Sequence, residues 1–127
     1  MIKFIIITAL GLLSLASVQA QQTVLVNSGE TITVTGGGLL YVSGDTRIDA
    51  GRINAMNLST VEFHGSVSVI TGGLYLYMDA SGLITGDLEI RQTATCWRYK
   101  PGVLTIEGTI RNSGTLNNEG EIVIGKP

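Results

Sequence analysis

The chain has too little cysteine and histidine for a fold held by covalent or metal cross-links. It contains one cysteine, Cys96, and one histidine, His64, among 127 residues. A single cysteine excludes an intrachain disulfide, and a structural zinc site needs four ligands of these types. We therefore expect no metal and no other cofactor, so that the fold depends on packing and backbone hydrogen bonds.

Charged residues are also scarce, at 14% of the chain, and the formal net charge is −2. Proteins that bind nucleic acid usually carry a basic patch or stripe, and the few lysines and arginines here are scattered. The sequence also lacks a paired acid and base, a Ser/His/Asp set and a phosphate-binding loop. We expect neither a nucleic-acid partner nor an enzymatic activity.

Proline is rare, with 2 residues, whereas glycine is abundant, with 17. Disordered linkers usually combine glycine with proline, so abundant glycine without proline indicates many tight corners instead. Because glycine recurs so often after residue 20, we expect no helix there.

The first twenty residues are organised as a secretory signal peptide. Lys3 supplies a positive charge, residues 4–15 are apolar, and Val18–Ala20 offers a small-x-small cleavage site. The apolar run is shorter than the ~20 residues that span a bilayer. We expect residues 1–20 to be removed and the protein to be secreted or held at the cell surface, without membrane association after cleavage. Residues 21–127 would form one domain.

The C-terminal part of the chain repeats every six residues. Glycine occurs at 102, 108, 114 and 120, and an apolar residue follows each glycine by two places. An amphipathic helix would instead place apolar residues at i, i+3, i+4 and i+7. A period of six is typical of short strands that are broken by glycine corners and stacked as coils.

A longer repeat lies over the hexads. Residues 32–42 match residues 67–77 at an offset of 35, and residues 44–48 match residues 86–90 at an offset of 42. An insertion of about seven residues between the two matches would explain the change of offset. This interpretation divides the mature chain into modules at about 31–65, 66–108 and a partial 109–127.

These patterns predict an all-β fold, a single-stranded β-solenoid of short stacked coils. One coil cannot bury its own apolar face, whereas stacked coils bury a continuous core. An antiparallel β-sandwich is the rival, but it needs turns every 8–12 residues. The predicted inward positions are Ile32, Val34, Val67, Val69, Leu88, Ile90, Leu104, Ile106, Ile110, Leu116, Ile122 and Ile124.

The chain resembles the repeat regions of secreted bacterial adhesin-type β-solenoid surface proteins, of the kind found in Bacteroidetes. Residues 108–120, GTIRNSGTLNNEG, resemble the G-x-L-x-N-x-G phrases of those proteins, and residues 37–45 resemble a companion phrase. The resemblance implies a structural or adhesin-like role without catalysis, with a surface glycan or another protein as partner. A self-assembling extracellular filament subunit and a small glycan-binding module are the alternatives.

One stretch, Gln92–Pro101, lacks glycine and contains the only tryptophan. We interpret it as a loop that leaves the coil and offers Trp97 and Tyr99 as stacking surfaces, with Arg98 for polar contacts. The alternative is that this loop folds back and covers apolar surface.

Tyr75 and Tyr77 alternate with two leucines, so both tyrosines would face outward if the leucines face the core. They would then either contact a ligand or pack against side chains of neighbouring strands on the sheet surface.

Two further features concern the corners and the end of the stack. Asp45, Asp87 and Glu121 take equivalent places in the repeat, and we expect them to form corner hydrogen bonds, not a calcium site. Lys126 and Pro127 are residue types that blunt a strand edge only weakly. We therefore expect self-association through the C-terminal coil edge.

Overall fold

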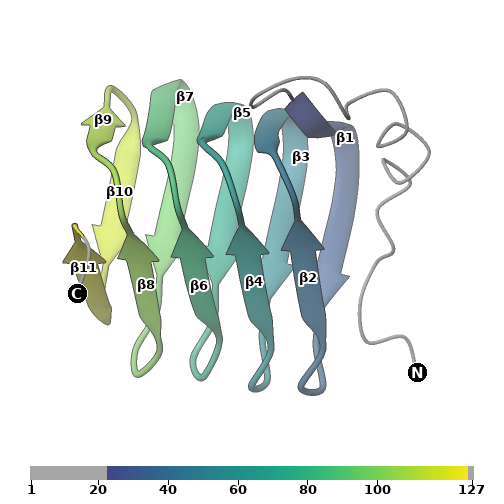
Figure 1. Cartoon of the computed structure of the whole chain (residues 1–127), viewed down its shortest axis with the longest axis vertical. Coiled ribbons are helices and arrows are strands. Elements are labelled where there is room, and N and C mark those ends of the chain that lie inside the picture. The colour runs from purple at the N-terminus through teal and green to yellow at the C-terminus, as the bar shows by residue number, and fades with distance from the viewer. Residues whose placement is uncertain (1–22, 126–127) are drawn as a thin grey trace.

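The protein is an all-β solenoid, described here by a computed structural model of residues 23–125 (Figure 1). The predicted signal peptide and Lys126–Pro127 lie outside the described residues. No helix in the described part is long and apolar enough to cross a membrane. The strands are β1 (Thr23–Val34), β2 (Leu39–Val42), β3 (Asp45–Ala55), β4 (Thr60–Phe63), β5 (Val67–Leu76), β6 (Ser81–Ile84), β7 (Leu88–Arg98), β8 (Val103–Ile106), β9 (Ile110–Asn112), β10 (Thr115–Asn118) and β11 (Glu121–Ile124).

The strands form two parallel sheets that wrap around one core. The long strands pair in the order β1-β3-β5-β7-β10, with β9 also on β7, and the short strands pair in the order β2-β4-β6-β8-β11. Figure 1 shows the short strands in front and the long strands folding over the top of the molecule and running down behind them. Every strand pair is parallel, which rules out the antiparallel sandwich.

Glycines let two of the long strands, β3 and β5, fold at their midpoints. Gly51 and Gly72 have φ of 82° and 97°, in the left-handed region that side chains rarely adopt. A Cβ atom on Gly72 would also collide with the carbonyl oxygen of Gly51 in the preceding coil. The fold at this row gives each long strand two outer faces, and the short strands supply a third.

The structural repeat is one coil of 21 or 22 residues. Ile48 pairs with Val69, and Val69 pairs with Ile90, an offset of 21 at each step. The structure corrects the alignment at an offset of 35, because Ile32 pairs with Ile53 and Ile53 with Leu74. The offset of 42 in the sequence therefore counts two coils, and no seven-residue insertion is needed.

The core is the inside of the coils. Seven of the twelve predicted inward residues have no exposed surface, and four are partly buried against the core. The prediction is wrong for Ile124, which is 59% exposed. This residue lies on β11, an edge strand of its sheet, so no further coil covers it among the described residues.

A charge on an inward position should unfold the protein. Leu104 on β8 is fully buried, whereas the neighbouring Thr105 is half-buried on the outer side of the strand. We expect Leu104→Asp to cost more than about 4 kcal/mol of unfolding free energy, because the carboxylate has no partner in the core. Thr105→Asp should change it by less than about 1 kcal/mol. Urea denaturation measures both, and equal losses would contradict the assigned facing.

Candidate functional site

The stretch predicted to leave the coil as a loop is a regular strand instead. Gln92 to Arg98 form the second half of β7, which pairs in parallel with β5 through Leu74 and Cys96. Ala94 takes the place of Gly72 in this coil, so the row at which the long strands fold holds no glycine in β7. The burial alternates along it, with Cys96 and Arg98 inside and Trp97 half-buried on the outer face. These residues therefore pack within the sheet and do not form the predicted loop.

The structure brings four of the five predicted site residues together on this outer face. Tyr75, Tyr77, Trp97 and Tyr99 form one stacked group, which we call the aromatic cluster. Ring centroids are 6.1 Å apart for Tyr75 and Tyr77 and 4.8 Å apart for Tyr77 and Tyr99. The Trp97 and Tyr99 centroids are 5.0 Å apart, with an angle of 7° between the ring planes. Such parallel offset pairs stabilise each other beyond the area that they bury.

The coil register creates this cluster from two pairs of residues that are separate in the sequence. Tyr75 and Trp97 are Cα partners across β5 and β7. The next outward row holds Tyr77 and Tyr99, whose amides donate to the preceding coil at 2.8 Å and 2.9 Å. Both pairs point away from the core in adjacent rows of neighbouring coils. Their rings therefore lie within stacking distance of one another.

Two residues of the neighbouring row hold the cluster in place. The guanidinium carbon of Arg52 lies 4.2 Å from the centroid of the Tyr75 ring, a cation–π contact. Arg52 pairs with Gly73, and a Cβ atom at Gly73 would collide with the Tyr75 ring. Glycine at position 73 therefore leaves the space in which that ring lies.

Polar side chains surround the aromatic cluster. Arg52 and Thr95 lie in the row of Gly73, beside the cluster. Asn54 and Asn117 lie at the two ends of the row that holds Tyr75 and Trp97. The Glu119 amide donates to the carbonyl oxygen of Arg98, which places Glu119 next to Tyr99. An apolar centre with a polar rim is the usual composition of a binding surface. Sequence patterns alone could not reveal this rim, because its members come from three different coils.

The phenol of Tyr99 stays neutral near physiological pH. Loss of solvation raises its pKa, and the nearby Tyr77, Glu119 and Tyr75 groups raise that pKa further against the opposing effect of Arg52. A protonated phenol can both donate and accept a hydrogen bond. Tyr99 therefore gives the aromatic cluster an uncharged group that can form hydrogen bonds.

Arg98, the fifth predicted site residue, does not belong to this surface. Its side chain points into the core and has no exposed surface. Nη1 donates to the carbonyl oxygen of Leu76 at 3.1 Å, while Nε and Nη2 have no hydrogen-bond partner among residues 23–125. Burial lowers the pKa of this guanidinium, with a smaller opposing effect from Cys96. Period-two alternation from Cys96 would have predicted its inward direction.

Cys96 is a core residue and not a nucleophile. Its side chain is fully buried, and burial raises the pKa of the thiol to about 12. The thiolate is the reactive form of cysteine, so a thiol with this pKa is inert at neutral pH.

Replacing Arg98 with leucine should stabilise the protein. Arg98 is the register partner of Leu76, so leucine already fits this row in the preceding coil. The Leu76 carbonyl would keep its hydrogen bond from the Tyr99 amide. We expect Arg98→Leu to raise the unfolding free energy by about 1–3 kcal/mol, because it removes a poorly paired buried charge.

The control for this prediction is Arg91→Leu, on the same strand but with a side chain that is 54% exposed. It should stay within about 0.5 kcal/mol of the wild type. Thermal or urea unfolding gives both values. Destabilisation by Arg98→Leu alone would mean that the guanidinium has a stabilising role that these contacts do not account for.

The acidic corner residues make hydrogen bonds to the next coil, as expected for two of the three. Asp45 accepts from the Ser66 amide at 2.8 Å, and Asp87 accepts from the Thr109 amide at 2.8 Å. Glu121 was wrongly aligned with them, because it lies on β11 and pairs with Val103 in the other sheet. Within residues 23–125, no group of side chains is arranged to hold a metal ion.

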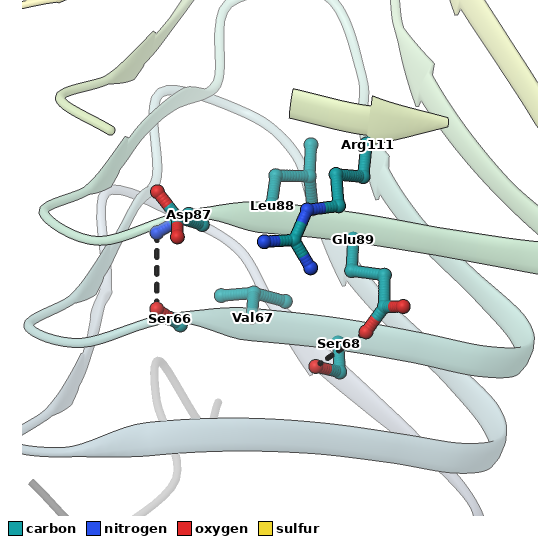
Figure 2. Close-up of a pocket in the computed structure, with 7 residues that line it drawn as sticks. All are labelled: Ser66, Val67, Ser68, Asp87, Leu88, Glu89 and Arg111. Atoms are coloured by element: carbon teal, nitrogen blue, oxygen red, sulfur yellow. Dashed lines mark hydrogen bonds between the residues drawn. The ribbon is translucent and has the colours of Figure 1, made fainter. Parts of the chain in front are cut away.

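A shallow cleft of about 200 Å³ lies on the other outer face of the long strands (Figure 2). Figure 2 shows the Arg111 guanidinium reaching over it from the coil above, with the carboxylates of Asp87 and Glu89 on either side. Glu89 and Arg111 are register partners, and Ser68 approaches Glu89 at 3.5 Å. The residues that line the cleft include no activated nucleophile. The negative charge of Glu89 lies opposite the positive charge of Arg111 on the neighbouring strand. It is lined by Ser66, Val67, Ser68, Asp87, Leu88, Glu89 and Arg111.

Comparison with known proteins adds no assignment to this geometry. No family model matches the chain, and neither a curated protein nor a solved structure matches it.

Proposed function

We propose that this protein is an exported, non-catalytic, adhesin-like repeat protein that binds a glycan through its aromatic cluster. The observation that carries the proposal is the stacking of Tyr75, Tyr77, Trp97 and Tyr99 into one group on a single outer face. Sugar rings have apolar C–H faces that pack on aromatic side chains and hydroxyl groups that need hydrogen-bond partners.

The rigidity of the cluster favours binding. Each ring is half-buried and in contact with at least one other ring, so little side-chain freedom remains to be lost. Ordering of mobile side chains is one of the main costs of association, and a preformed surface avoids it. The regular coils supply this stiffness, since adjacent coils hold their outer rows in fixed register.

The rim supplies the polar contacts that a glycan needs. Arg52 donates hydrogen bonds, Asn117 can donate and accept, and the neutral Tyr99 phenol can do both. Arg52, Asn117 and Tyr99 are all at least partly exposed. The mixture contains no dominant charge, which favours neutral sugars over polyanionic ones.

The test is a glycan array followed by titration of the best ligand with residues 21–127. Trp97→Ala and Tyr99→Ala should each weaken binding by about tenfold or more, as truncation of a central aromatic anchor usually does. The matched control is Tyr41→Ala. Tyr41 is 49% exposed and stacks on His64 at 4.6 Å, but it belongs to the short-strand sheet.

Binding by the wild type and by Tyr41→Ala, with loss in both cluster variants and unchanged circular dichroism, supports the proposal. An array without signal, or equal affinity in all four proteins, refutes it. A sizing column run on the same samples addresses the alternative of a filament subunit. That alternative uses the edge strands β10 and β11, where Ile124 is exposed, and it requires polymers that grow with concentration.

A further inference from the structure

The corner that joins each long strand to the following short strand carries two protruding apolar side chains. Leu58 is 71% exposed and Met78 is 62% exposed, the two highest values among the exposed large apolar residues of the described chain. They lie on successive coils, because Thr60 of one coil pairs with Ser81 of the next. We propose that this corner, defined by Leu58 and Met78, docks on the surface of a phospholipid bilayer.

The backbone at this corner adopts a left-handed conformation that is strained for leucine and methionine. Leu58 has φ of 66° and Met78 has φ of 45°, in the left-handed region that favours glycine or asparagine. The first coil has Gly37 at the position equivalent to Leu58, with φ of 76°. Glycine would therefore suit this corner better, and the exposed side chains gain too little packing within the chain to compensate. These side chains are therefore available for a contact outside the chain.

The neighbours of the corner fit the boundary between lipid and water. Tyr77 directly precedes Met78, and Tyr99 directly precedes Lys100 in the next coil. Tyrosine and lysine commonly place an apolar body in the lipid interface and a polar end in water. Asp79 opposes the charge of Lys100, so the contact would be hydrophobic and would not depend on anionic lipid.

The small area of the corner decides between a bilayer and a protein. A stable protein complex buries about 800 Å² on each partner, far more than two side chains supply. A bilayer interface can accept individual apolar side chains from a peripheral protein. This proposal revises the expectation of no membrane association, which considered only a segment that spans the bilayer.

The test is co-sedimentation of residues 21–127 with sucrose-loaded phosphatidylcholine vesicles. The double variant Leu58→Asn/Met78→Asn should lower the partition coefficient by about tenfold or more, because it removes the inserted apolar area. Its melting temperature should be unchanged or higher, because asparagine tolerates the left-handed region. The matched control is Ile124→Thr, which alters a residue that is 59% exposed on another part of the surface. It should sediment like the wild type.

Binding of the wild type and of the control should persist when NaCl is raised from about 0.1 M to about 1 M, since screening weakens only charge-dependent contacts. The proposal is overturned if the wild type does not sediment, if the double variant sediments equally, or if salt abolishes binding. It is also overturned if the wild type ignores vesicles and forms a dimer that the double variant does not form. The corner would then be a protein interface.

Discussion

The structure depends on parallel backbone pairing between coils of 21 or 22 residues. Each strand hydrogen-bonds to the equivalent strand one coil away, so a position in one coil lies beside the same position in the next. Apolar residues at inward positions consequently form continuous rows, such as Ile48, Val69 and Ile90. The same constraint acts on the outer faces, where it brings Tyr77 beside Tyr99. The core and the aromatic cluster therefore have one origin.

Departures from this regularity mark the residues with the most distinctive environments. Arg98 occupies a core row in which the preceding coil has Leu76, and two of its nitrogens lack partners among residues 23–125. Leu58 occupies a corner in which the preceding coil has glycine. Local rules that a sequence breaks without a compensating contact often indicate function. Leu58 is exposed and can contact a partner. Arg98 is buried, so it affects the stability of the fold and not a surface contact.

Sequence reasoning predicted the solenoid, most of its inward residues and the outward direction of Tyr75 and Tyr77. These results follow from local patterns, namely glycine spacing and period-two alternation. It did not predict the coil length, because the match at an offset of 42 counts two coils. It also mistook half of β7 for a loop because glycine was absent there. The aromatic cluster was missed for a different reason. Its members are 22 residues apart, and only the register between coils joins them.

A measurement of the register between coils tests the proposed parallel coil stacking most directly. Proton nuclear Overhauser effects on residues 21–127 would detect contacts between side chains one coil apart. The parallel register predicts contacts of Val69 with Ile90 and of the Tyr77 ring with the Tyr99 ring, with no Hα–Hα contacts of antiparallel strands. Strong Hα–Hα contacts, or contacts between Ile32 and Val67 at the offset of 35, would contradict it.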